Sequence, residues 1–277
     1  MLLVSTSGYY GSLGRPPRSR ADRHQRLQQA VPPVQAESHG IHGICGSHKV
    51  AQVLHDRDDL ESACRNTVAA TMRELGRTSC VRKTFQPTTT PADPTTQPAA
   101  NKLAQDFTAD APNRKGGTDI TDLPTTAGWV YLAVVVDLFS RKVVGWSLSP
   151  SPATECVCKA LRRAIESRRP GGRQLPHHSD RGGQYTSDAD QQTLRRLGIE
   201  CSMSRTGCGY DNAARERFFR SLQHEWTSHR TDNNLEDVRR SVFLYLESFY
   251  NPVRLHQTLG DLSPDQYEAE HAPAQAA

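Results

Sequence analysis

A stretch rich in proline and threonine, residues 84–101, divides the 277-residue chain. It holds four prolines and six threonines, and Phe85 is its one large apolar residue. A segment of this composition cannot bury a core and is typical of an extended linker. We therefore expect a linker over residues 84–105, a small region before it, and a larger domain over residues 106–277.

The first 37 residues are expected to form a basic helical arm. Five arginines stand against one acid, Asp22, in the first 26 residues; they are Arg15, Arg18, Arg20, Arg23 and Arg26. This charge fits contact with nucleic-acid phosphates, and it fits a solvated tail equally well. A helix is expected over residues 22–35, but Pro32 and Pro33 predict a break or a kink in it.

Two short helices are expected in the next region, residues 38–83. One covers residues 48–55 and the other residues 65–75, where apolar residues recur at helical spacing before Gly76. Two short helices joined by a turn are compatible with a helix-turn-helix that binds DNA. An ordinary helical pair explains the same pattern.

The larger domain alternates strands and helices. Two apolar runs, residues 129–136 and 142–148, are close enough in sequence to predict a β-hairpin. The elements expected after it are a helix over 155–168, a strand over 174–179, a helix over 187–198, a strand over 200–204, and helices over 211–228 and 235–250. This order indicates an α/β fold with a mixed sheet flanked by helices.

The composition argues against a membrane protein and against a disulfide-linked module. Hydrophobic residues make up 36% of the chain, and no apolar run approaches the roughly 20 residues of a membrane span. The N-terminus lacks the pattern of a secretion signal, so a cytoplasmic location is expected. The seven cysteines are odd in number and contain no CxxC pair, which favours reduced thiols.

Three acids are the candidate catalytic residues: Asp119, Asp180 and Glu216. If the fold brings them together, their mutual repulsion calls for a divalent cation, and Mg²⁺ prefers such oxygen ligands. Two such ions can bind the attacking and the leaving oxygen when a phosphodiester is displaced. Each acid taken alone is explained better by a helix cap, a turn or a surface charge; the ordered trio with its local contexts favours catalysis.

Ordered motifs carry a resemblance to a known family. They include Thr118-Asp119-Ile120-Thr121, Val144-Gly145-Trp146, His177-His178-Ser179-Asp180-Arg181-Gly182, Asp211-Asn212-Ala213, Glu216-Arg217-Phe218-Phe219 and Phe249-Tyr250-Asn251, followed by Arg254 and His256. With these segments the chain resembles the insertion-sequence transposases that carry a retroviral-integrase-type catalytic core, the DDE recombinases. The resemblance runs from about residue 5 to the C-terminus and is strongest over residues 119–269.

The resemblance implies an RNase H-like core with Asp119 on the first strand, Asp180 after the fourth strand and Glu216 on a helix. It implies that these acids hold Mg²⁺ or Mn²⁺, as two ions, and that DNA is cleaved at element ends and joined to a target. It also implies helix-turn-helix residues within 38–83, a homo-oligomer working on DNA in the nucleoid, and an upstream reading frame that supplies further DNA binding.

Five further residues are candidate DNA contacts: Arg181, Arg205, Asn212, Arg220 and Gln223. Helical spacing places Asn212, Arg220 and Gln223 near the face that carries Glu216. Surface roles explain these residues nearly as well. Packing is the expected role of Tyr250, Arg254 and His256, and initiation of a turn is the expected role of Asp137.

Departures from the family pattern keep other functions open. Gly116 and Gly117 replace an aromatic strand residue, Asp122 stands where an aromatic is common, and Gln223 stands where Lys or Arg usually contacts phosphate. These changes motivate the alternative of a degenerate DNA-binding remnant, catalytically weak or inactive. A general nuclease with the same core is a third possibility.

Overall fold

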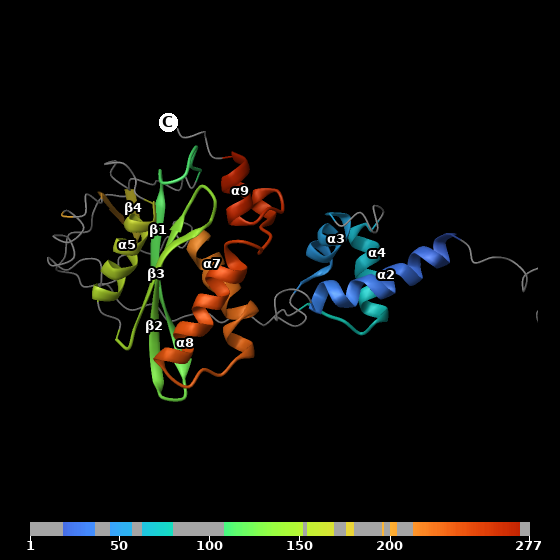
Figure 1. Ribbon diagram of the computed structural model, residues 1–277, viewed down its shortest axis with the longest axis horizontal. Coiled ribbons are helices and arrows are strands. Elements are labelled where there is room, and N and C mark those ends of the chain that lie inside the picture. The colour runs from blue at the N-terminus through green and yellow to red at the C-terminus, as the bar shows by residue number, and fades with distance from the viewer. Residues whose placement is uncertain are drawn as a thin grey trace, which may run out of the picture. The chain divides into compact units, whose positions relative to one another are not determined.

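The computed structural model describes residues 19–36, 45–56, 63–79, 108–151, 154–168, 176–179, 196, 200–203 and 213–271. The chain divides into two compact units, residues 1–81 and residues 82–277 (Figure 1). In these described segments, no helix has the length and apolar character needed to cross a bilayer.

The N-terminal unit is built from three helices around one core. They are α2 (Ser19–Ala36), α3 (Ser47–Asp56) and α4 (Arg65–Glu74). The core residues come from all three helices: Leu27, Val31, Val34, Val50, Ala51, Leu54, Val68 and Met72. The two short helices expected from the sequence are confirmed to within one residue at each end. Because α2 shares their core, the described part of the basic arm packs with them in one unit.

Of the two outcomes predicted for the prolines of the first helix, the break is wrong and the kink stays a prediction. Helix α2 continues through Pro32 and Pro33 to Ala36. A proline removes one helical hydrogen bond and crowds the preceding turn. Here both prolines lie within the last five residues, and the neighbouring Val31 and Val34 are 0% and 5% exposed in the shared core. We attribute the continuation of the last turn to this packing.

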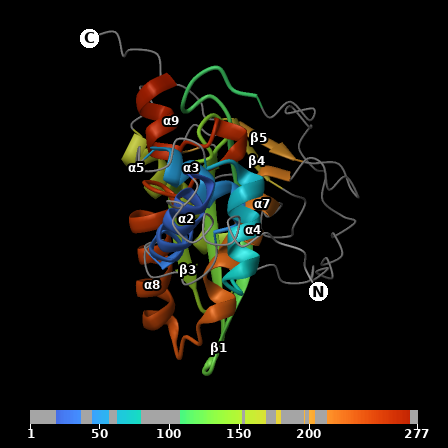
Figure 2. The same ribbon diagram turned by 90° about the vertical axis from the view of Figure 1, so that its right-hand side faces the viewer.

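The C-terminal unit contains a mixed sheet of five described strands in the order β3-β2-β1-β4-β5. Strands β1 (Gly116–Thr125), β2 (Gly128–Asp137) and β3 (Val143–Ser149) are antiparallel neighbours, so the predicted hairpin is confirmed. Strand β4 (Pro176–Ser179) runs parallel to β1, and β5 (Glu200–Met203) runs parallel to β4. Figure 2 shows β4 and β5 side by side at one edge of the sheet.

Helices cover both faces of the sheet (Figure 1). Helix α5 (Thr154–Arg168) packs on one face against Ala133 and Val135 of β2. Gly145 of β3 permits this approach, because a Cβ there would lie 2.7 Å from the backbone nitrogen of Ala164. Helices α7 (Ala213–Glu225) and α8 (Leu235–Phe243) lie on the other side. The predicted helix over 187–198 falls outside the described residues, apart from residue 196.

The predicted helix over residues 235–250 is confirmed in extent but changes type. Helix α8 passes directly into η4, a π-helix over Leu244–Tyr250. A π-helix is bonded from i to i+5, so residues five apart share a face. Tyr245 and Tyr250 accordingly lie with ring centroids 5.8 Å apart, and both are buried. Short 3-10 helices, Thr227–His229 and Gln257–Leu259, and α9 (Pro264–His271) complete the described chain.

Candidate active site

Strand β1 and helix α7 position two of the three candidate acids. Asp119 lies on β1 and Glu216 lies in the first turn of α7, and the two elements pack against each other. Asp119 is half-buried, and its Oδ1 accepts a hydrogen bond of 2.8 Å from the backbone N–H of Ile120. The strand and the helix expected for these two residues are therefore present.

The pleat of β1 decides which way Asp119 faces. The next residue, Ile120, packs against the apolar cluster beneath α5. Successive side chains of a strand point to opposite faces, so Asp119 points to the face away from α5. That face carries α7 (Figure 1). Asp119 and Glu216 therefore lie on the same side of the sheet.

The carboxylate of Glu216 is exposed and forms no ion pair or hydrogen bond within the described part of the chain. This is notable because Arg220, four residues later on the same helix, is at the usual spacing for a pair. In contrast, Phe218 and Leu222 are 1% and 0% exposed. Glu216 thus lies off the apolar face of α7, as its helical position predicts, and its oxygens are available to a ligand.

Asp180 lies outside the described residues, and so do Arg181, Arg205 and Asn212. In the sequence, Asp180 directly follows Ser179, the last residue of β4. Strand β4 is the parallel neighbour of β1, with His177 and His178 opposite Gly116 and Gly117. Within the described segments no three His, Cys, Asp or Glu residues gather as a metal site. The predicted catalytic trio thus remains a prediction.

The two described candidates for DNA contact, Arg220 and Gln223, are exposed on α7. Neither forms an ion pair with another described residue. Gly116 and Gly117, the departures expected to weaken β1, are buried strand residues that pair with β2 on one side and β4 on the other. The strand that carries Asp119 therefore forms through them.

Asp137 is expected to start a turn, and Arg254 and His256 are expected to pack inside the protein. The carboxylate of Asp137 accepts hydrogen bonds from the backbone N–H groups of Asn113 and Phe139, at 2.7 and 2.8 Å, which confirms its place in a turn. Burial raises the pKa of Asp137. Arg254 and His256 are directed into the protein, where Arg254 lies 3.2 Å from the His256 ring nitrogen. The predicted packing role of these two residues is confirmed.

Sequence reasoning missed Glu225, a buried acid at the C-terminal end of α7 that holds Arg254. The exposed fractions of the two side chains are 10% and 11%, and their closest atoms are 2.6 Å apart. Burial lowers the pKa of Arg254, but the Glu225 carboxylate outweighs it and raises that pKa above its ordinary value. Glu225 follows Phe218 and Leu222 at apolar helical spacing. An acid at such a position signals a buried cationic partner.

Comparisons with known proteins agree with this architecture. A family model described as "Integrase core domain" matches residues 109–208, and a second with the same description matches residues 197–264. The chain is 44% identical over 204 residues to "Transposase InsF for insertion sequence IS3A" of Escherichia coli (strain K12). The matched segment covers 73% of this chain and 69% of that relative.

A second relative matches nearly the whole chain. It is "Putative transposase for insertion sequence element IS986/IS6110" of Mycobacterium tuberculosis (strain ATCC 25177 / H37Ra), 33% identical over 273 residues, with 97% of this chain and 96% of the relative covered. Among solved structures, a chain of the simian T-cell lymphotropic virus intasome in complex with PP2A regulatory subunit B56 gamma matches with a TM-score of 0.50. It is 17% identical and covers 89% of this chain and 76% of that one.

The structural match bears on the fold alone, and it confirms the expected RNase H-like α/β core. The two sequence relatives and the two integrase-core matches carry the family assignment. The chain belongs to the insertion-sequence transposases with an integrase-type catalytic core.

Proposed function

We propose that this protein is a DDE transposase that cleaves and joins DNA at the ends of an insertion sequence. In this proposal Asp119, Asp180 and Glu216 are the catalytic acids and hold two divalent cations. The supporting observation is that Asp119 and Glu216, which has no partner among the described residues, lie on the same side of the sheet, beside the strand that Asp180 follows in sequence. The names of the sequence relatives agree with transposition as the process.

The donor set fits Mg²⁺ or Mn²⁺. The three residues offer carboxylate oxygens, which are the ligands these hard cations prefer. A bound cation would neutralise the crowded acids and polarise the phosphodiester. Asp119 Oδ1 accepts a hydrogen bond from the Ile120 N–H, and this bond orients the carboxylate on its strand. Glu216 has no competing partner among the described residues, so metal binding there requires no existing ion pair to break.

Positive charge near Glu216 is suited to the DNA backbone. Arg220 is exposed one turn after Glu216, and Gln223 is exposed nearly one turn further along α7. We assign Arg220 to a phosphate contact, with Arg181, Arg205, Asn212 and Gln223 as further DNA contacts. Phosphate contacts fix the register of a protein on DNA and make binding sensitive to salt.

The N-terminal unit is proposed to bind the element ends. Its helices α3 and α4 supply the helix-turn-helix-like pair, and α2 completes their core. In this division residues 1–37 are the arm, 38–83 the helical pair, 84–105 the linker and 106–277 the catalytic domain. A homo-oligomer on paired DNA ends, a location on the nucleoid and an upstream reading frame are part of the same proposal.

The decisive experiment uses the full chain and DNA carrying its matching element ends. End cleavage and strand transfer are measured with Mg²⁺ and with Mn²⁺, for the wild type and for Asp119→Asn, Asp180→Asn and Glu216→Gln. All three variants are expected to lose both activities while retaining the wild-type circular dichroism spectrum. The matched control is Asp122→Asn, an exposed acid on the same strand as Asp119. Undiminished activity of Asp180→Asn would refute the proposal.

The same assay separates the two alternatives. A degenerate remnant would bind the ends in a salt-sensitive way without cleaving them, and Gln223→Lys would leave it inactive. The pairing of Gly116 and Gly117 on both sides of β1 argues against the remnant, because the strand under Asp119 is intact. A general nuclease would cut DNA of random sequence as well as DNA with element ends.

A further inference from the structure

The buried pair of Glu225 and Arg254 joins the end of α7 to the chain that follows η4. Arg254 Nε donates to Glu225 Oε2 and Arg254 Nη2 donates to Glu225 Oε1, each at 2.6 Å. Nη2 also donates to Ser221 Oγ at 2.7 Å. One guanidinium therefore binds two α7 residues that are four positions apart, on one face of the helix.

Tyrosines of the π-helix η4 complete this attachment. Tyr245 donates its hydroxyl to Glu225 Oε2 at 3.2 Å. The Tyr250 ring lies edge-on to Phe218 with centroids 5.0 Å apart, and Arg254 lies over the Tyr250 ring at 5.7 Å. Because η4 presents residues five apart on one face, Tyr250 contacts Phe218 in the middle of α7 while Tyr245 contacts Glu225 at its C-terminal end. Helix α7 is thus held at its middle and at its C-terminal end by one segment.

This attachment bears on Glu216 through the rigidity of a single helix. Glu225 lies nine positions after Glu216, which is about 14 Å along an α-helix. A tilt of roughly 4° about the Glu225 end would therefore move Glu216 by about 1 Å. Displacements of about 1 Å at a catalytic group can reduce rates by about 100-fold. A contact remote from the acids can in this way control their geometry.

We propose that Arg254 is a positioning residue that fixes the tilt and rotation of α7, through Glu225 and Ser221, and so aims Glu216 at the metal site. The inference rests on the proposed function, because it takes Glu216 as a metal ligand. A buried ion pair is in general weak evidence for stability, since apolar replacements often fold as well. Because Arg254 binds α7 at both Glu225 and Ser221, the effect we assign to it is to fix the orientation of this helix.

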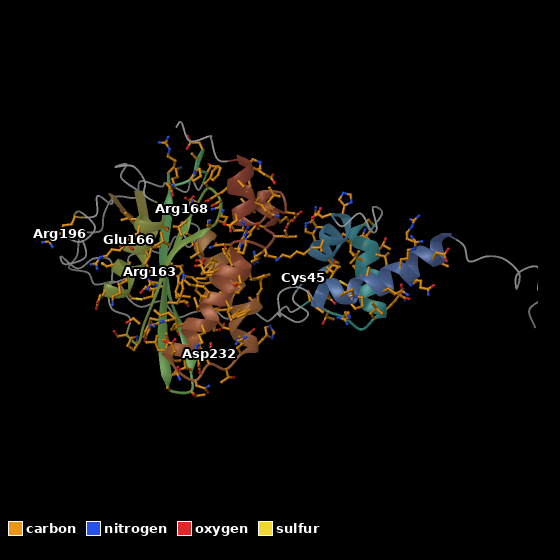
Figure 3. The ribbon with its side chains drawn as sticks, in the orientation of Figure 1. Cys45, Arg163, Glu166, Arg168, Arg196 and Asp232 are labelled. Carbon is orange, nitrogen blue, oxygen red and sulfur yellow. The ribbon has the colours of Figure 1, made fainter. Side chains whose placement is uncertain are left out.

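The chain offers a matched control in a second buried arginine–carboxylate pair. Arg168, at the end of α5 (Figure 3), donates to Glu268 from both Nη atoms, at 2.6 and 2.8 Å. The exposed fractions of these side chains are 15% and 13%, close to those of the Arg254 pair. This pair joins α5 to α9 and includes no residue of α7. Arg254→Lys and Arg168→Lys therefore make the same chemical change at similar burial.

The test measures the affinity of the full chain for Mn²⁺ by electron paramagnetic resonance, and the Mg²⁺ concentration that gives half-maximal strand transfer. Loss of a group that orients a metal ligand typically weakens metal binding by about 10- to 100-fold. We expect Arg254→Lys to weaken Mn²⁺ binding at least about tenfold and to raise the Mg²⁺ requirement in parallel. Arg168→Lys is expected to change neither, although both variants lower the melting temperature.

Two further variants decide the remaining outcomes. If Arg254→Lys does not fold, Ser221→Ala removes one arm of the attachment and is expected to weaken Mn²⁺ binding in the same direction. Glu216→Gln tests the underlying function: unchanged Mn²⁺ binding there would reject Glu216 as a ligand. Suppose that Glu216→Gln weakens Mn²⁺ binding but Arg254→Lys, like Arg168→Lys, does not. The positioning role of Arg254 is then overturned and the proposed function stands. If Arg254→Lys does not fold, Ser221→Ala replaces it in this comparison.

Discussion

Asn251→Ala is expected to destabilise the C-terminal unit strongly, because one side chain satisfies two backbone groups of strand β3. Asn251 Oδ1 accepts from the Val143 N–H and Asn251 Nδ2 donates to the Val143 carbonyl, both at 3.0 Å. Asn251 is 3% exposed and Val143 is 4% exposed. Alanine would leave both groups of Val143 without a partner and away from water.

The magnitude follows from the number of groups left unpaired. Each buried polar group without a hydrogen bond costs about 1–3 kcal/mol, so two such groups give about 2–6 kcal/mol. We take about 3 kcal/mol as the expected loss of unfolding free energy, because water that enters the space vacated by the amide relieves some of the penalty. In a unit of this size each kcal/mol lowers the melting temperature by roughly 2–4 °C, which gives a shift of about 6–12 °C.

Urea unfolding followed by circular dichroism measures this loss. The control is Asn233→Ala, an exposed asparagine whose side chain donates to Asp237 Oδ2 at 3.0 Å, where a change within about 0.5 kcal/mol is expected. Asn251→Asp keeps the acceptor and loses the donor, so it should recover stability as pH falls and its carboxyl becomes protonated. Equal losses in Asn251→Ala and Asn233→Ala would refute the reasoning.

Three further predictions follow from burial and charge. Gly145→Ala should lower the free energy of unfolding by about 1–3 kcal/mol, because the added Cβ would collide with α5. The control is Gly46→Ala in the same urea titration. It should have little effect, because the nearest neighbour of the added Cβ lies at 3.6 Å. Burial opposes ionisation of Glu268, but hydrogen bonds from Arg168 and Ser140 outweigh it and lower its pKa below the ordinary 4.5. The pair should thus stabilise the fold above about pH 4.5 and lose that effect as pH falls through the lower folded pKa; an unchanged pH slope in Glu268→Gln would contradict this. Burial raises the pKa of Tyr250 to about 12, so its phenolate absorbance should not develop near pH 10 while the fold persists.

Much of the local structure could be predicted because its causes are local. The apolar runs of the hairpin predicted β2 and β3. Most of β2 is buried on both faces, and such a strand needs nearly continuous apolar residues. Burial alternates along β3. Helix α4 ends near the expected Gly76, whose φ of 64° favours glycine. The position of Glu216 off the apolar face of its helix also followed from spacing alone.

Other features depend on partners that are distant in sequence. The last turn of α2 survives two prolines because α3 and α4 bury Val31 and Val34, which no local pattern reveals. The Glu225–Arg254 pair joins residues 29 positions apart. The geometry of this pair also depends on η4. The apolar pattern over α8 and η4 predicts one continuous helix and does not reveal that the second part is a π-helix. Sequence reasoning therefore found most of the described elements, although not α9 or the two 3-10 helices, and it missed the contacts that orient α7.

The outer strand β3 has its free edge occupied by side chains. Asn251 forms hydrogen bonds with both backbone groups of Val143, and Ser167 donates to the Val144 carbonyl at 2.9 Å. Arg163, on α5 (Figure 3), donates to the Trp146 carbonyl at 2.8 Å. An uncovered edge strand is a template for pairing with another chain. Any copy adding a strand here would first have to displace these three residues. This edge of the described sheet is therefore protected against edge-to-edge pairing with a strand of another copy.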